Sequence, residues 1–273
     1  MRIGTKEFDT TNHTYLMGIL NITPDSFSDG GKYHTLDAAL FRVEEMLKEG
    51  MDILDIGGES TRPGYIQISD DEEIGRIVPV IEAVKERFDV PVSLDTYKGA
   101  VAKAGIRSGA DLINDIWGLQ YDPEMGKIIA DSQVACCLMH NRKEADYTSF
   151  MEDMAADFTH ILHTAEAAGI SKDKIILDPG VGFGKTYEQN LAAIGHLKEL
   201  QTLGYPLLLG TSRKSVIGLT LNVEPEERLI GTVVTGVFGI LQGCSFLRVH
   251  DIKAHAQAIK MAEAILGQMQ NSK

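Results

Sequence analysis

Residues 92–115 read VSLDTYKGAVAKAGIRSGADLIND and contain one complete strand–helix–strand unit. The apolar run Val92–Leu94 is short and ends on Asp95. An amphipathic segment follows at Ala100–Ser108, and a second apolar run lies at Leu112–Ile113. Short, fully apolar strands separated by helices are typical of a parallel sheet whose outside is covered by helices. Because this unit recurs along the chain, it decides the fold.

Apolar runs and amphipathic segments alternate over the whole sequence. The predicted strands are Tyr15–Leu20, Ile53–Ile56, Val92–Leu94, Leu112–Ile113, Val134–Met139, Ile175–Leu177, Leu207–Leu209 and Phe246–Val249. The predicted helices are Leu36–Lys48, Glu73–Arg87, Ala100–Ser108, Met151–Ala168, Leu191–Leu203, Leu229–Leu241 and Ile252–Met269. Eight such units that close on themselves make a (β/α)8 TIM barrel of about 250 residues, and an open parallel sheet is the alternative. No Pro/Ser-rich linker divides the chain, so we expect one barrel domain over residues 1–273.

The composition limits the classes of partner. The net charge of −13 argues against a nucleic acid or an anionic membrane, because phosphate groups attract basic surfaces. A small anionic ligand remains open, since it needs only a local cationic pocket. Cys136, Cys137 and Cys244 lack metal-ligand spacing, and no apolar run is long enough to cross a bilayer. We therefore expect a soluble, cytoplasmic protein.

Polar side chains follow nearly every predicted strand. They are Asn21, Gly57-Gly58-Glu59, Asp95, Asn114-Asp115, His140, Asp178, Ser212-Arg213-Lys214 and Arg248-Val249-His250. Capping of the next helix would explain Asp, Asn or Ser, but Lys, Arg and His are poor caps because a helix N-terminus repels cations. Barrel active sites lie at the carboxyl ends of the strands, so we expect the site there. The long connections 21–35 and 57–70 lie on that side.

Two pairs of these side chains indicate an anionic ligand with a polar ring. Arg248 and His250 are two residues apart and face the same way in extended chain, so they predict an anion clamp; pairing with nearby carboxylates such as Asp251 is the alternative. Asp95 and Asp178 are costly to bury without hydrogen bonds, and they would suit a heterocycle with several N–H donors. The alternative for either acid is an internal network with Lys214.

Glycine-rich segments follow the second and sixth predicted strands. Residues 57–64 (GGESTRPG) can bring backbone N–H groups, a hydroxyl and a guanidinium to an oxyanion. Residues 178–186 (DPGVGFGKT) nearly match a nucleotide-binding P-loop, but Pro179 stands where that motif needs its first glycine. We therefore reject an ATPase. The glycines are predicted instead to let backbone approach a flat ligand beneath Phe183.

Two long motifs, residues 20–31 (LNITPDSFSDGG) and 55–64 (DIGGESTRPG), resemble the signatures of the dihydropteroate synthase family. Five further matches follow in the family's order: 93–96, 113–116, 178–185, 212–215 and 248–251. The resemblance extends from about Leu16 to the last helix. It implies a folate-pathway transferase that condenses 6-hydroxymethyl-7,8-dihydropterin pyrophosphate with p-aminobenzoate, giving 7,8-dihydropteroate and pyrophosphate. It also implies Mg²⁺ as cofactor, a homodimer, and a target of sulfonamides.

The resemblance also assigns roles to single positions. The pterin ring is expected on Asp95, Asn114, Asp178 and Lys214. The pyrophosphate site is expected on Asn21, Thr61, Arg248 and His250, with Asn21 also a magnesium ligand. The p-aminobenzoate pocket is expected on Phe27, Arg62, Pro63, Phe183, Lys214 and Ser215. The catalytic residues are expected to be Asp95, Lys214, Arg248 and His250.

Three other functions fit parts of the sequence. A pterin-binding methyltransferase module would share the barrel and the pterin pocket, but it usually works beside a corrinoid domain. A Schiff-base aldolase would use Lys214 as its nucleophile, with a pKa lowered beside Arg213. A non-catalytic pterin-binding protein would have no use for a pyrophosphate clamp. Segment 231–241 is apolar almost all round, so we expect part of it in a dimer interface; burial within one chain is the alternative.

Overall fold

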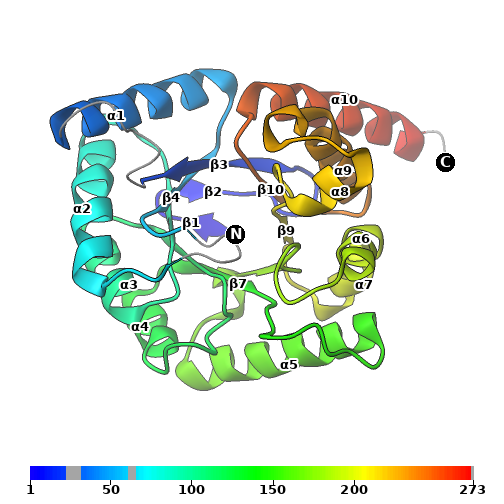
Figure 1. The fold of residues 1–273 in the computed structure, drawn as a ribbon, viewed down its shortest axis with the longest axis horizontal. Coiled ribbons are helices and arrows are strands. Elements are labelled where there is room, and N and C mark those ends of the chain that lie inside the picture. Colours follow the sequence, from blue (N-terminus) through cyan, green and yellow to red (C-terminus); the bar gives the residue numbers. More distant parts are fainter. Residues whose placement is uncertain (23–31, 61–65, 272–273) are drawn as a thin grey trace.

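The computed structural model describes residues 1–22, 32–60 and 66–271, in which eight parallel strands surround a central interior (Figure 1). These strands are β3 (Tyr15–Asn21), β4 (Ile53–Gly57), β5 (Val92–Asp95), β6 (Leu112–Asp115), β7 (Ala135–Met139), β8 (Ile175–Asp178), β9 (Leu208–Leu209) and β10 (Phe246–Val249). All eight coincide with predicted strands to within two residues at either end. Four of them extend past the predicted apolar run and include the polar residue that follows it.

The eight strands close into a ring. Neighbouring strands pair in chain order from β3 to β8, and β10 pairs with both β3 and β9. An isolated parallel bridge between Leu177 and Leu207 joins β8 to the start of β9, where Leu177 N donates to Pro206 O at 2.9 Å. The (β/α)8 barrel is therefore confirmed, and the open sheet is excluded.

Helices form the outer wall (Figure 1). They are α1 (Lys32–Glu49), α2 (Asp70–Arg87), α3 (Gly99–Arg107), α4 (Met125–Ser132), α5 (Phe150–Ala168), α6 (Tyr187–Gly195), α7 (Leu197–Leu200), α8 (Ser215–Leu221), α9 (Leu229–Leu241) and α10 (Ile252–Asn271). Sequence analysis did not predict α4 and α8, and it joined α6 and α7 into one helix. Among the described residues, no helix is long and apolar enough to cross a membrane.

Local sequence explains where the helices begin. The hydroxyl of Ser69 accepts from Glu72 N at the start of α2, whose first turn is acidic as the helix dipole favours. Thr186 and Gln189 form a reciprocal capping box at the start of α6. Neither start uses a residue that ends a strand. These two helices therefore take no cap from the polar residues at the strand ends.

The barrel interior is apolar at the end where the strands begin. Met17, Ile53 and Phe246 face inward there and pack against Ile3 and Phe8. A hairpin of β1 (Arg2–Ile3) and β2 (Lys6–Glu7), which sequence analysis did not predict, supplies this plug. Because side chains alternate along a strand, the inward positions of β4 continue from Ile53 to Asp55 and Gly57. The interior thus turns from apolar to polar toward the carboxyl ends of the strands.

Candidate active site

Four of the strand ends lie at one level of the barrel mouth. Register pairs Asn21 with Gly57, Gly57 with Asp95, and Asp95 with Asn114, across β3 to β6. A Cβ at Gly57 would lie 3.6 Å from Asn21 Oδ1 and 3.7 Å from Asp95 Cβ, so this glycine leaves the space between them open. Strand register therefore brings three predicted site residues together although they are far apart in the sequence.

Arg248 lies inside the mouth between two carboxylates. Its Nε donates to Asp55 Oδ2 at 2.7 Å, and its Nη2 donates to Asp95 Oδ2 at 2.6 Å. Asp55 is fully buried and also accepts from Ser93 Oγ at 2.5 Å. These two contacts use two of the five N–H donors of a guanidinium, which leaves others for an anion. Sequence reasoning gave Asp55 no role, although a lone carboxylate within an apolar strand was a signal that could have found it.

Asp95 has one paired and one unpaired oxygen. Oδ2 binds Arg248, whereas Oδ1 is buried and no donor among the described residues reaches it. Burial raises the pKa of Asp95, and the guanidinium of Arg248 opposes that rise. An unpaired buried carboxylate oxygen is costly, so this atom calls for a donor from a ligand. The internal network suggested for Asp95 involves direct contact with Arg248, not with Lys214.

Asp178 and Lys214 occupy the side of the mouth formed by β8 and β9. Asp178 Oδ1 accepts from Gly180 N at 2.7 Å, while Lys214 Nζ donates to Val181 O at 2.5 Å and lies 4.9 Å from the ring centre of Phe183. Burial raises the pKa of Asp178, which Lys214 opposes, and burial lowers the pKa of Lys214 to about 8. A cationic group thus lies beside an aromatic face.

Two smaller features complete this side. A Cβ at Gly210 would lie 3.7 Å from both Asp178 Oδ2 and Arg248 Cβ, so a glycine keeps the space between them open. Ser215 follows Lys214 directly and begins α8.

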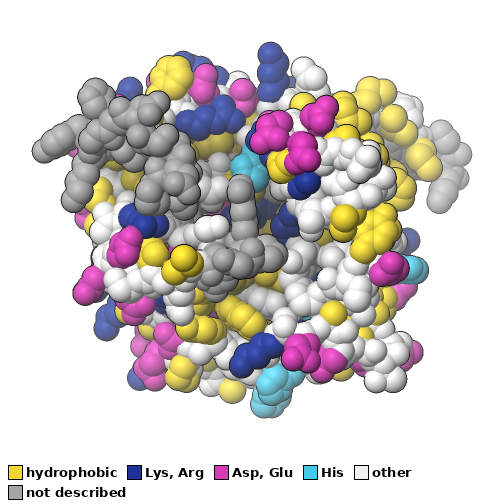
Figure 2. All heavy atoms as spheres, in the orientation of Figure 1, with side chains coloured by type: hydrophobic (Ala, Val, Ile, Leu, Met, Phe, Trp, Pro, Cys, Tyr) yellow, Lys and Arg dark blue, Asp and Glu magenta, His cyan; other side chains and the backbone are white. Residues whose placement is uncertain are grey.

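The surface view shows basic and histidine side chains near the middle of the face drawn in Figure 2. The mouth therefore combines carboxylates at depth with cations around them.

The contacts of His250 and Asp251 bear on the carboxylate-pairing alternative. His250 Nδ1 lies 2.9 Å from Ser212 Oγ, and the His250 N–H donates to the same hydroxyl. Asp251 binds the guanidinium of Arg213 with both oxygens, at 2.7 and 3.1 Å. Asp251 therefore pairs with Arg213, whereas the carboxylates that Arg248 contacts are Asp55 and Asp95, as the pairing alternative expected.

The structure corrects one sequence interpretation for two of its three glycines. The glycines of residues 178–186 were expected to let backbone approach a ligand, but a Cβ at Gly180 would meet His140 O and one at Gly184 would meet Arg142 O. Both glycines have left-handed φ values, +68° and +52°. They are required because this loop packs against the backbone of the loop that follows β7. Gly182, whose Cβ would face Lys214, is the exception.

Four predicted site residues cannot be placed. They are Phe27, Thr61, Arg62 and Pro63, which lie outside the described residues. The described parts of the pterin and pyrophosphate sites do come together, namely Asn21, Asp95, Asn114, Asp178, Lys214, Arg248 and His250 at the strand ends. Of the p-aminobenzoate pocket, Phe183, Lys214 and Ser215 are described.

The residues present fit magnesium only in part. No cluster of three or more His, Cys, Asp or Glu side chains able to hold a metal exists among the residues that the structure describes. Asn21 offers one amide oxygen at the mouth, beside the open position at Gly57. Mg²⁺ often takes only one or two protein ligands and completes its shell with phosphate oxygens and water. Asn21 fits that kind of site, in which a phosphate-bearing ligand supplies further oxygens.

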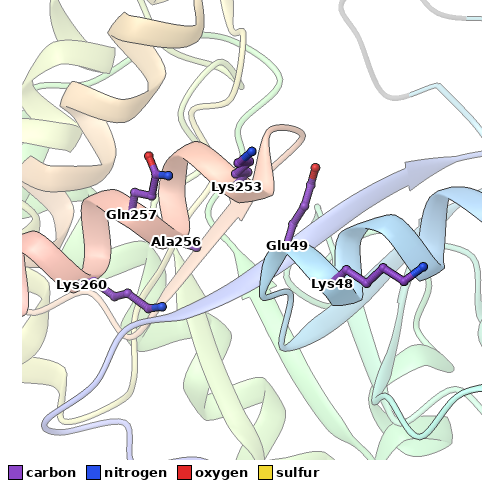
Figure 3. A pocket seen from close by; sticks show the side chains of 6 residues that line it. All are labelled: Lys48, Glu49, Lys253, Ala256, Gln257 and Lys260. Atoms are coloured by element: carbon purple, nitrogen blue, oxygen red, sulfur yellow. The ribbon is translucent and has the colours of Figure 1, made fainter.

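A separate recess of about 350 Å³ lies on the outer wall between α1 and α10. Lys48, Lys253 and Lys260 line it, but Figure 3 shows that their ammonium groups do not converge on one point. Glu49 also lines it and removes part of the positive charge. This recess has no strand end in it and is not the candidate site.

The sequence profile of the pterin binding enzyme family matches residues 17–250. A dihydropteroate synthase of Clostridium beijerinckii is 55% identical over 267 residues, which are 97% of this chain and 99% of that protein. The chain belongs to the dihydropteroate synthase family. A dihydropteroate synthase of Clostridium difficile solved in the presence of pteroic acid has a TM-score of 0.93 at 48% identity, covering 95% of this chain and 99% of its own. A dihydropteroate synthase of Yersinia pestis in complex with a sulfonamide drug has a TM-score of 0.92 at 43% identity, covering 98% and 99%.

These comparisons confirm the predicted family and fold. The match covers almost the full length of both chains, so it includes every strand end described above. The protein is an enzyme of the dihydropteroate synthase type.

Proposed function

We propose that the barrel mouth binds 6-hydroxymethyl-7,8-dihydropterin pyrophosphate and p-aminobenzoate and joins them into 7,8-dihydropteroate. The observation that carries this assignment is Asp95 Oδ1, a buried carboxylate oxygen without a donor among the described residues. A pterin ring offers several N–H donors along one edge. Asn114 lies beside Asp95 in the strand register, and Asp178 lies across Gly210 from Arg248. These three side chains would together read the polar edge of the ring.

The cations of the mouth suit the leaving group. Arg248 lies near the end of β10 and His250 follows the strand directly, and the remaining donors of Arg248 can bind pyrophosphate oxygens. Charge develops on the bridging oxygen as its bond to the pterin methylene breaks, and fixed cations stabilise that charge. Asn21 would hold Mg²⁺, which when bound neutralises phosphate charge. Departure of pyrophosphate is thereby favoured.

The arylamine would enter beside Lys214 and Phe183. Its nitrogen attacks the methylene carbon, the carbon–oxygen bond to pyrophosphate breaks, and the nitrogen loses one proton, which the departing pyrophosphate can take up. Asp95 and Asp178 would stabilise positive charge on the pterin during this exchange, because both carboxylates lie in the low-dielectric mouth. Lys214 can bind the carboxylate of p-aminobenzoate, and its proximity to the Phe183 ring places cation and aromatic face together.

An activity assay separates this proposal from its nearest alternative. Purified protein is incubated with the pterin pyrophosphate and p-aminobenzoate, with and without Mg²⁺, and dihydropteroate and pyrophosphate are quantified. Equal amounts of both products, formed faster with Mg²⁺, are expected. A pterin-binding methyltransferase module would form neither product, and its ligand would be a methylated pterin. Absence of both products with folded protein would therefore overturn the proposal.

We also propose a homodimer that forms through α9. Ile230, Val234, Phe238 and Leu241 are exposed by 50–70%, and their spacing places them on one face of the helix. The buried face of α9 carries mostly small residues, whereas these four large apolar side chains form a stripe on its exposed face. Neighbouring helices of the same chain therefore leave this stripe uncovered. Exposed apolar side chains of α8 and α10 adjoin it, and Figure 2 shows apolar surface on that side of the molecule. Large exposed apolar patches mark interfaces.

Light scattering tests the dimer directly. A mass of about twice 29.9 kDa at micromolar concentration is expected, and a mass of one chain would contradict it. The cytoplasm remains our proposed location. All three cysteines are buried and free, which suits a reducing compartment.

A further inference from the structure

The loop after β8 ends on a lysine whose ammonium group is surrounded by protein acceptors. Lys185 Nζ lies 3.0 Å from Gly180 O and 3.0 Å from Phe183 O, both in its own loop. It also lies 3.0 Å from His140 Nδ1 and 3.3 Å from His140 O in the loop after β7. A phosphate-binding lysine would present its ammonium to a ligand. This one faces the backbone of two loops and joins them.

The joined loop carries two groups of the proposed site. Gly180 accepts from Lys185 through its carbonyl while its N–H donates to Asp178 Oδ1 at 2.7 Å. The carbonyl of Phe183 is held by the same ammonium, and the Phe183 ring lies beside Lys214. Lys185 thus contacts the backbone of Gly180, which donates to the Asp178 carboxylate, and the backbone of Phe183, whose ring lies beside Lys214.

The His140 ring that contacts Lys185 is itself held in place by a charged pair, Asp157 and Arg142. His140 Nε2 lies 2.8 Å from Asp157 Oδ2, which also accepts from Arg142 Nε at 2.7 Å. Burial lowers the pKa of His140 to about 4, so its ring is neutral. With Nε2–H donating to Asp157, the Nδ1 lone pair is left to accept from Lys185. Asp157 is held in its ionised form, since its pKa is lowered by hydrogen bonds from Arg142 and His140 that outweigh its partial burial.

We propose that Lys185 is a positioning residue of the pterin and arylamine sites, acting through the backbone of Gly180 and Phe183. This inference rests on the proposed function, because it needs Asp178 and Phe183 to contact the substrates. Lys185 Nζ lies within 3.3 Å of four acceptors, namely three carbonyls from the two loops and a fixed imidazole nitrogen. Burial lowers the pKa of Lys185 to about 7, and its N–H groups can donate to these acceptors in either protonation state. Glycines at 180 and 184 allow the loops to approach closely enough for this contact. The P-loop-like sequence therefore serves to organise a site and does not itself bind phosphate.

The test compares four variants of the full-length protein. Lys185→Met keeps the length of the side chain and removes all donors, whereas Lys185→Arg keeps the charge with a different donor geometry. Lys103→Met is the matched control, since Lys103 is exposed on α3. Ile259→Ala on α10 is a stability control, because it removes a buried side chain far from the mouth. Each is assayed for its thermal midpoint, its Kd for pteroic acid by calorimetry, and KM and kcat for both substrates.

We expect Lys185→Met to raise the Kd for pteroic acid about tenfold or more, and to raise KM for both substrates. Lys185→Arg should recover part of the affinity. Ile259→Ala should lower the thermal midpoint without changing Kd, and Lys103→Met should change neither. If Lys185→Met instead behaves as Ile259→Ala does, Lys185 has a structural role only and the inference is overturned. Should Lys185→Met fail to fold, the same comparison is made with Lys185→Gln, which shortens the side chain and removes its charge, and an unchanged Kd and KM for that variant would equally overturn it.

Asp178→Asn distinguishes failure of this inference from failure of the proposed function. If Asp178→Asn weakens binding of pteroic acid while both Lys185 variants bind it normally, the site assignment holds and only the positioning role is lost. If Asp178→Asn binds pteroic acid as the unaltered protein does, the proposed pterin site itself is wrong.

Discussion

Replacing Asp95 with Asn separates a catalytic carboxylate from a purely structural one. The substitution keeps the size of the side chain and removes its charge. In the structure, Oδ2 binds Arg248 at 2.6 Å and Oδ1 is buried without a donor among the described residues. The amide oxygen of Asn can still accept from Arg248, and Arg248 keeps its contact with Asp55. No buried charge is therefore left unpaired by the change.

These contacts set the expected magnitudes. Exchanging a charge-assisted hydrogen bond for a neutral one should lower the free energy of unfolding by no more than about 2 kcal/mol. For a chain of this size, that corresponds to a fall of at most about 8 °C in Tm. If the carboxylate stabilises positive charge on the pterin, about 3–4 kcal/mol of transition-state stabilisation is lost. Turnover should then fall roughly a hundred- to a thousand-fold.

The assay measures Tm and steady-state turnover on the same preparation. Asp111→Asn is the matched control, because Asp111 binds Lys85 and Val92 N at the opposite end of the barrel. We expect that control to keep its turnover within about twofold, as surface substitutions away from a site usually do little. A destabilised Asp95→Asn protein with near-normal turnover would show that Asp95 is a structural residue and not a catalytic one.

Three further perturbations test separate parts of the structure. Arg248→Ala removes the cation between Asp55 and Asp95, so the free energy of unfolding should fall by about 3–5 kcal/mol in urea titration; an unchanged midpoint would show that the network is not formed. Burial lowers the pKa of Lys214 to about 8 from an ordinary 10.5, so kcat/KM should decline as pH rises through about 8. Between pH 8 and 10.5 this lysine is protonated in the unfolded chain but not in the folded one, so the free energy of unfolding should rise with pH over that range. A flat kcat/KM profile from pH 7 to 9 would contradict a role for the ammonium form. Phe238→Glu places a charge in the exposed stripe of α9 and should halve the mass seen by light scattering with little loss of secondary structure; a mass equal to that of the unaltered protein would exclude this stripe as the interface.

The strands were predictable because a barrel buries both faces of a parallel strand. Each becomes a short apolar run, and its first polar residue marks the mouth, as Asp95 and Asp178 show. The hairpin of β1 and β2 was not predictable, since strands of two residues carry no periodicity. The eight-residue helix α4 offers only about two turns of pattern.

The site was predictable at the strand ends and not behind them. Asp55 and Arg248 are 193 residues apart, and only barrel closure brings β10 beside β3 and near β4. Nothing in a single sequence reports such a contact. The same holds for Lys185, to which the sequence assigned no role, because its contacts with the loop of His140 follow from packing between two loops.

We infer that Asp95 Oδ1 receives its missing donor from a pterin ring at the barrel mouth. A crystal structure of the protein with 6-hydroxymethylpterin tests it most directly. We predict a ring nitrogen within about 2.7–3.2 Å of Asp95 Oδ1, with Asn114 and Asp178 on the same edge of the ring. A pterin bound elsewhere, or one that lies in the mouth and leaves Asp95 Oδ1 without a donor, would contradict the claim.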